Sequence, residues 1–189
     1  MSNETKITIK TFKTVTKAIA QSDNLDIMTN HLCQLLVTAL GIKACAIYLL
    51  DLETNELEPL ASFGLTPGYL AKGPLTAKRS LADTLEGKPV IVADVANDTR
   101  VQYPQEAQKE GIGAMLSLPV MSSGGILGAV RLYHSEPWHI SDEDLESLLL
   151  LCDYIGLAMT FTSLLNAVQS IYEVIRNDLP VAVSPAIKN

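Results

Sequence analysis

Apolar residues recur at helical spacing at both ends of the chain. One pattern spans residues 12–19, and a second spans residues 25–40 and stops at Gly41, a residue typical of helix ends. Near the other end, Ser141 precedes three acidic residues, which the helix dipole favours in a first turn. We therefore expect two amphipathic helices at the start of the chain and a long helix over residues 141–177.

Short apolar runs in the middle of the chain predict strands. Residues 44–50 and 57–63 are joined by a polar turn, and residues 115–121 and 126–134 flank a Ser-Ser-Gly-Gly turn. Each pair is therefore predicted to form a β-hairpin. The order of helices, hairpin, irregular segment, hairpin and long helix is typical of an α+β fold with an antiparallel sheet.

Glycines and prolines break residues 64–111 into short pieces. Within this segment we expect one strand at residues 90–93. We also expect two short helices, at residues 80–85 and 103–109.

The amino-acid composition indicates one folded domain and argues against binding to nucleic acid. The 189 residues are 48% hydrophobic and 19% charged, and the formal net charge is −7. The 14 Lys and Arg residues are scattered, so no basic surface is expected to neutralise phosphates. Residues 1–21 lack the apolar core of a secretory signal, and we expect a cytoplasmic protein.

Residues 147–165 are apolar for almost the length of a membrane span. Asp153 lies within them, and a carboxylate costs about 2.5–3.5 kcal/mol in a membrane-spanning helix. The acidic SDEDLE run just before this segment is typical of the start of a soluble helix. We expect a buried helix and no membrane partner.

Candidate chemistry is sparse. Cys33, Cys45 and Cys152 lack metal-ligand spacing, which favours small buried residues in a reducing compartment. The histidines show no metal-like spacing either, and no motif of a known catalytic centre occurs. We therefore expect no metal site and no enzyme, although an acid–base pair such as Asp94 with His134 stays open.

Several segments in combination resemble the GAF family of small-molecule sensor domains. They are residues 44–51, ASFGL at 61–65, GPLTAKRSLADTLEGKPVIVADV at 73–95, DTRVQYP at 98–104, AMLSLPV at 114–120 and GILGAVRLY at 125–133. The resemblance implies an antiparallel sheet of about six strands with the terminal helices on one face. A ligand pocket, roofed by the irregular segment, is implied on the other face.

The domain boundaries follow from the same comparison of segments. We expect a GAF domain over residues 23–160, between an N-terminal dimerisation helix at 1–22 and a helical extension for dimerisation at 161–178. Residues 179–189 are expected to form a disordered tail.

The known pocket signatures of the family do not identify a ligand. Bilin-binding members attach the chromophore through a cysteine, but residues 64–111 contain none. The pattern of the cyclic-nucleotide-binding members cannot be placed. Free methionine sulfoxide reductases use cysteines in pocket loops, whereas the cysteines here are predicted on helices and a strand. The ligand and any cofactor therefore stay unknown.

The resemblance does imply which residues border a pocket. The sheet would contribute Met115 and Ser117, with Val130, Leu132 and His134 from the next strand. The roof would come from residues of the irregular segment, namely Leu81, Asp94, Val101 and Tyr103. A few polar groups in an apolar concavity suit a small molecule. The alternative is that these side chains fill the space.

Arg131 is the only cation within an apolar strand run. The resemblance to the GAF family implies that its side chain faces the terminal helices. Asp153 is an equally isolated charge there, within an apolar helix. Because buried charges are normally paired, we expect an ion pair between Arg131 and Asp153.

Apolar residues of the long helix also recur at alternating steps of four and three, the spacing that keeps one side toward a partner helix. They are Leu150, Tyr154, Leu157, Phe161, Leu164, Val168, Ile171 and Ile175. The six from Leu157 onward are expected to form a homodimer interface within a four-helix bundle. The alternative is that the N-terminal helix of the same chain folds back over them.

Together these features favour a stand-alone GAF-type sensor that acts as a homodimer, binds an unidentified small molecule and signals through a separate effector protein. One alternative is an enzyme similar to free methionine sulfoxide reductase, which needs a thiol beside the pocket. Another is a structural dimerisation module with a filled pocket.

Overall fold

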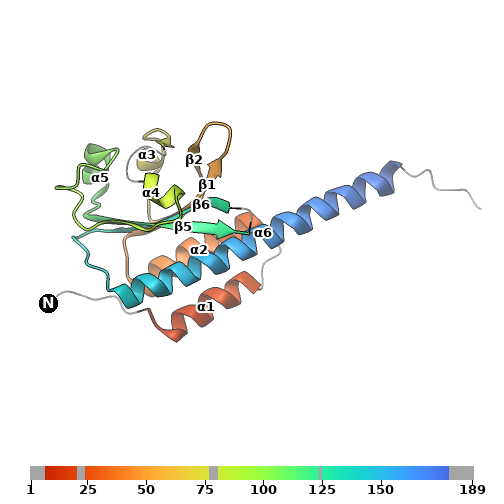
Figure 1. The fold of residues 1–189 in the computed structure, drawn as a ribbon, viewed down its shortest axis with the longest axis horizontal. Helices are drawn as coiled ribbons and strands as arrows, with labels where there is room; N and C mark the ends of the chain where they lie inside the picture. Colours follow the sequence, from red (N-terminus) through yellow and green to blue (C-terminus); the bar gives the residue numbers. More distant parts are fainter. Residues whose placement is uncertain (1–6, 21–23, 77–80, 124, 179–189) are drawn as a thin grey trace, which may run out of the picture.

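A computed structural model of the chain describes residues 7–20, 24–76, 81–123 and 125–178 (Figure 1). Within these ranges six strands form one antiparallel sheet in the order β3-β2-β1-β6-β5-β4. The strands are β1 Ala44–Asp51, β2 Glu56–Phe63, β3 Leu75–Thr76, β4 Val90–Val92, β5 Ala114–Ser122 and β6 Gly125–His134. The expected α+β class with an antiparallel sheet is confirmed. The expected tail at 179–189 and the first residues of the expected N-terminal helix lie outside the described ranges.

The helices divide between the two faces of the sheet (Figure 1). Two long helices pack on one face, α2 Leu25–Leu40 and α6 Asp142–Asp178, and α1 Ile9–Ala20 lies on their outer side (Figure 1). Three short helices lie over the other face: α3 Pro67–Leu70, α4 Ala82–Leu85 and α5 Pro104–Glu110. The sequence pattern missed β3 and α3, because two and four residues are too few to show a period.

Each face of the sheet carries its own apolar cluster. The helix-side core includes Leu32, Leu36, Ile47, Leu118, Leu132 and Ile155. The loop-side core, under the short helices, includes Tyr48, Tyr69, Leu81, Val101, Met115 and Tyr133. Successive strand residues alternate between the two cores, as the pleat requires.

Local signals explain where α2 begins and ends. The Asn24 side chain accepts a hydrogen bond from the Ile27 backbone N–H at 3.0 Å, which satisfies one of the free donors of the first turn. At the other end, Gly41 adopts a left-handed φ of 64°, which glycine tolerates without strain. The chain then enters β1 at the centre of the sheet.

The long helix α6 runs without interruption through Gly156. A Cβ atom at position 156 would overlap the backbone oxygen of Met121 on β5. The glycine therefore lets the helix contact the sheet closely instead of producing a kink. Residues 163–177 of the same helix are all exposed, and at 1.5 Å per residue they are about 22 Å long. This half of α6 projects beyond the sheet (Figure 1).

By length and composition alone, α6 could cross a membrane. Core helices of soluble domains meet the same test. The first half of α6 packs on the sheet through Leu148, Leu151, Cys152 and Ile155, which are all buried. Part of the stretch that is long enough to span a bilayer is therefore buried in the helix-side core.

Candidate functional site

The strand register corrects the prediction for β6. Met115 lies opposite Tyr133, and Ser117 lies opposite Arg131. Cross-strand neighbours project from the same face of a sheet. Met115, Tyr133 and Arg131 therefore share the loop side, where the sequence placed Met115 and Ser117 but not Arg131.

The same register moves three predicted pocket residues to other surroundings. Val130 and Leu132 belong to the helix-side core, so their predicted position at the pocket is wrong. The ring of His134 stacks on Trp138 with centroids 5.6 Å apart, and its Nδ1 atom lies 3.1 Å from the Glu136 backbone nitrogen. All three assignments fail for one reason: these residues alternate along β6 with Arg131 and Tyr133, which the register places on the side of Met115 and Ser117.

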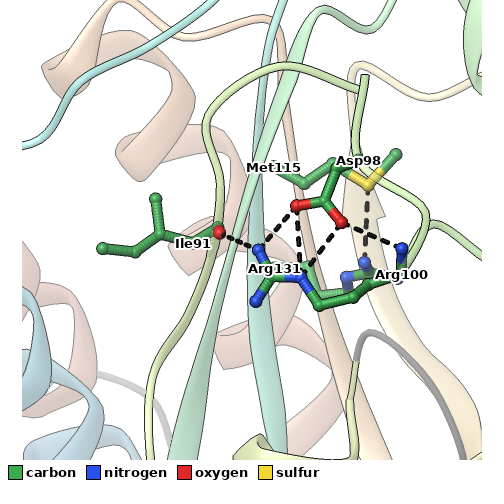
Figure 2. A network of polar contacts seen from close by, with 5 residues as sticks. All are labelled: Ile91, Asp98, Arg100, Met115 and Arg131. Carbon is green, nitrogen blue, oxygen red and sulfur yellow. Dashed lines mark hydrogen bonds and ion pairs between the residues drawn. The ribbon is translucent and has the colours of Figure 1, made fainter. Parts of the chain in front are cut away.

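The expected ion pair between Arg131 and Asp153 is also wrong. Asp153 is exposed on α6, on the opposite side of the sheet from the buried Arg131. The Arg131 Nη2 atom donates to the Met115 sulfur at 3.4 Å (Figure 2). Its guanidinium also lies 5.7 Å from the centroid of the Tyr133 ring. Arg131 thus adds a positive charge to the loop-side core.

A second arginine near this region has a structural role (Figure 2). Arg100 and Asp98 form an ion pair at 2.6 Å, and Arg100 also donates to the Ile91 carbonyl of β4 at 2.7 Å. The arginine holds the pKa of the Asp98 carboxyl below its usual range, mainly through its side-chain hydrogen bonds. The pair ties the loop after β4 to the free edge of that strand.

The remaining predicted pocket residues do not enclose one space. Leu81, Val101, Met115 and Ser117 are all buried. The Tyr103 hydroxyl donates to the Pro74 carbonyl at 2.9 Å. The centre of the loop side is therefore filled by side chains.

Asp94 and His134 show no sign of an acid–base pair. The Asp94 carboxylate accepts hydrogen bonds from the Ala96 backbone nitrogen at 2.9 Å and from the Asn97 side chain at 2.7 Å. These contacts hold the turn after β4. His134 is engaged within its own turn in the same way.

Three tyrosines and two cations form the main polar group of the loop side, which we call the tyrosine–cation cluster. It consists of Tyr48, Tyr69, Lys72, Arg131 and Tyr133. The Tyr48 and Tyr133 hydroxyls lie 3.1 Å apart, and the Tyr69 ring meets the Tyr133 ring edge-on at 6.0 Å. The Lys72 Nζ atom lies 3.8 Å from the centroid of the Tyr69 ring. The cluster thus connects Arg131 in the core to Lys72 near the surface.

Burial dominates the ionisation of this cluster. It raises the pKa values of Tyr48, Tyr69 and Tyr133, and the nearby Arg131 charge offsets only part of the effect. Burial also lowers the pKa of Lys72 to about 8, and the positive charge of Arg131 adds to this shift. At neutral pH the tyrosines are therefore neutral donors and Lys72 is mostly charged.

A cavity of about 340 Å³ opens beside this cluster. It lies between β2 and the segment that links α3 to β3. Its walls are Tyr48, Glu56, Leu57, Glu58, Pro59, Leu70, Ala71, Lys72, Gly73, Pro74 and Leu75. Sequence reasoning missed Lys72, since a lone lysine in a Gly- and Pro-rich loop gives no signal until the fold places it on tyrosines.

A second cavity of about 290 Å³ lies beneath α5. Its walls are Asp94, Val95, Ala96, Pro104, Gln105, Gln108, Ile112 and Gly113. Asp94 is the one predicted pocket residue that borders it. The two cavities therefore lie in different parts of the irregular segment.

The three cysteines are far from a pocket-loop arrangement. Cys33, Cys45 and Cys152 are free and belong to the helix-side core. Burial raises the pKa values of Cys45 and Cys152, which favours the unreactive thiol form. Among the described residues, no group of three acidic, histidine or cysteine side chains could hold a metal ion.

Solved structures share this fold. The GAF domain of a phosphoenolpyruvate-protein phosphotransferase from Coxiella burnetii matches with a TM-score of 0.75 at 20% identity, over 84% of this chain and 96% of that one. The corresponding Acinetobacter domain gives 0.71 at 19%, with the same coverage. Free methionine-R-sulfoxide reductase from Neisseria meningitidis, solved with its substrate, gives 0.72 at 14%, over 86% and 97%.

Identities at this level establish a common fold and leave the activity open. No curated protein sequence matches the chain. The model of the GAF domain family matches residues 22–160, which is most of the chain and contains the whole sheet. With its six-stranded sheet and its two divided faces, the chain belongs to the GAF domain family.

Proposed function

We propose that the chain is a sensor module that binds a small molecule in the 340 Å³ cavity beside the tyrosine–cation cluster. The cavity carries this proposal, because its volume lies within the range of small-molecule sites. Its walls combine apolar side chains with a few polar groups, including Tyr48 and Lys72. This composition is typical of sites that bind an apolar body and orient it through a few contacts.

A sensor is favoured over a thiol enzyme by the position of the cysteines. Attack by sulfur requires an accessible thiolate. All three thiols are buried in the helix-side core, while the cavity lies on the loop side. We therefore propose no catalytic activity, and a cytoplasmic location in which these thiols stay reduced.

Native mass spectrometry of freshly purified protein tests the cavity directly. We expect an added mass that is lost in Ala71→Trp, whose new side chain would occupy the cavity. Ala96→Trp is the matched control, because Ala96 is also exposed but borders the second cavity. Loss of the added mass in Ala96→Trp alone would assign the ligand to the second cavity and contradict the proposal.

We also propose that the sensor acts as a homodimer through α6. The eight residues with alternating spacing, which we call the α6 seam, are all exposed in the single chain. They are Leu150, Tyr154, Leu157, Phe161, Leu164, Val168, Ile171 and Ile175. An uninterrupted apolar stripe of this length is seldom left in water. Helix α1 lies against α2 and the first half of α6, so it does not cover the projecting half (Figure 1).

The opposite side of α6 supports this assignment. Over the sheet, that side is apolar and buried at Leu148, Cys152, Ile155 and Met159. Beyond the sheet, at the same angular position, it becomes polar at Asn166, Ser170 and Glu173. The composition thus changes where the sheet ends, whereas the seam stays apolar to Ile175. A second α6 is the partner we propose for it, with a separate effector protein receiving the signal.

One observation favours the alternative of a structural dimerisation module. The centre of the loop side is occupied by Tyr48, Tyr69, Tyr133 and Met115, all at most 4% exposed. If no small molecule is retained or bound by the intact dimer, this packed centre would make the loop side a structural layer alone.

A further inference from the structure

The cavity has an asymmetric lining that bears on its ligand. Most of its wall is apolar, formed by residues such as Leu57, Pro59 and Leu75. Among the described wall residues, Lys72 is the cation. Its amine donates to the Tyr69 carbonyl at 3.1 Å, which fixes the side chain over the Tyr69 ring and leaves two further N–H donors.

The acidic wall residues are placed less favourably for a ligand. Glu58 is exposed and alternates along β2 with Leu57, which faces the loop-side core. Its carboxylate therefore points toward the other face of the sheet. Glu56 alternates in the same way and pairs with Thr76 at the edge of the sheet.

The Tyr48 and Tyr133 pair supplies a second donor. Tyr133 is completely buried, and its hydroxyl lies against that of Tyr48. A fully enclosed hydroxyl has to donate its proton to avoid an unsatisfied donor, so we assign the Tyr133 proton to the bond with the Tyr48 oxygen. The proton of the Tyr48 hydroxyl then remains available. Tyr48 borders the cavity, so this proton can be donated to a ligand.

We propose that the ligand is a small apolar molecule with one carboxylate, bound by the Lys72 amine and the Tyr48 hydroxyl. This inference rests on the proposed ligand-binding function. One amine and one hydroxyl match a single negative charge with two acceptor oxygens. The buried Arg131 charge adds a positive potential beneath them, which favours an anion over a neutral or cationic ligand.

Several charged groups surround Lys72 and set its response to pH. Arg131 repels its charge, whereas Glu106 and Glu110 of α5 attract it. Glu110 is itself held by hydrogen bonds from the Thr66 backbone and hydroxyl, at 2.9 and 2.5 Å. Glu56 and Glu58 border the same cavity from β2. Because the Lys72 pKa is about 8, carboxylate binding should weaken between pH 7 and pH 9.

Three probes with one ring and different charges test the ligand class: phenylacetate, phenylacetamide and 2-phenylethylamine. In NMR titrations of the full chain we expect phenylacetate to bind at least tenfold more tightly than the amide, and the amine to bind most weakly. Lys72→Met should reduce phenylacetate affinity to that of the amide and leave amide affinity unchanged. The amide also reports that the variant is folded. Lys88→Met, at an exposed site, is the matched control.

The outcomes separate this inference from the proposed function. Equal or tighter binding of the amide or the amine, blocked by Ala71→Trp, would keep the cavity as a site but reject a carboxylate ligand. An unchanged phenylacetate affinity in Lys72→Met would also reject it. Absence of binding by all three probes at millimolar concentration would reject the carboxylate ligand, whereas the added mass in native mass spectrometry would still decide whether the cavity is a site.

Discussion

The hydroxyls of Tyr48 and Tyr133 lie 3.1 Å apart between two strands at the centre of the sheet. Tyr133 has no exposed surface, while Tyr48 borders the cavity. The two residues therefore depend on their shared hydrogen bond to different degrees. The buried Tyr133 hydroxyl relies on the Tyr48 hydroxyl as its hydrogen-bond partner. The Tyr48 hydroxyl can also bond to solvent or to a ligand in the cavity.

This asymmetry predicts unequal effects of removing either hydroxyl. Tyr48→Phe leaves the buried Tyr133 hydroxyl unsatisfied and should lower the free energy of unfolding by about 1–3 kcal/mol. Tyr133→Phe should cost only about 0.5–1.5 kcal/mol. Urea denaturation of both variants and of the double variant measures this. The double variant should lose less than the sum, and strictly additive losses would show that the hydroxyls are not coupled.

Lys72 should make stability depend on pH. Burial lowers its pKa from 10.5 to about 8 in the folded state, so between these values the unfolded chain binds more protons. The contribution of Lys72 to the free energy of unfolding therefore rises as pH increases through this window. Because the side chain is partly exposed, the effect will be smaller than for a fully buried amine.

The measurement compares the wild-type chain with Lys72→Met by urea denaturation at pH 7, 8, 9 and 10. The free energy of unfolding of the wild type, relative to that of Lys72→Met, should increase as pH rises. Buried tyrosines contribute equally to both proteins and cancel. Lys88→Met should show no such trend, and a similar trend there would remove the assignment to Lys72.

The larger elements and the family were accessible from sequence because they depend on repeated local patterns. The pairs of apolar runs gave β1 with β2 and β5 with β6, and the acidic start of α6 was read correctly. The resemblance to the GAF family was also confirmed by the family model over residues 22–160.

The site was less accessible, because it depends on relations between distant residues. The face of β6 follows from its pairing with β5, in which Met115 lies opposite Tyr133. An error of one residue moved Leu132 to the wrong side and led to the incorrect pairing of Arg131 with Asp153. Lys72 becomes notable only when α3 places it on Tyr69, and no local pattern predicts that contact.

Gly156 offers a test of the packing of α6. Alanine is the better helix former by about 1 kcal/mol, so Gly156→Ala should stabilise an isolated helix. Here the added Cβ would overlap the Met121 carbonyl and must push α6 away from β5. We expect a net loss of about 1–3 kcal/mol in the free energy of unfolding. Ser170→Ala, on the exposed half of α6, is the control and should be neutral or slightly stabilising. A stabilised Gly156→Ala would mean that α6 does not pack this closely.

The α6 seam predicts the state of assembly. Phe161 and Val168 are both more than half exposed in the single chain, and a dimer would bury them. Phe161→Glu combined with Val168→Glu would place four carboxylates in the interface of two chains, where like charges repel and lose hydration. Sedimentation velocity should then show a monomer, whereas the wild-type chain should sediment as a dimer.

The matched control for the seam adds the same charge to the other side of the same helical segment. Asn166→Glu combined with Ser170→Glu changes the side of α6 that turns polar beyond the sheet, so the dimer should persist. Circular dichroism would show whether each variant keeps its helices. A folded Phe161→Glu and Val168→Glu variant that still sediments as a dimer would place the interface elsewhere. Loss of the dimer in both double variants would point to net charge instead of seam contact, since only the seam pair lies on the apolar stripe.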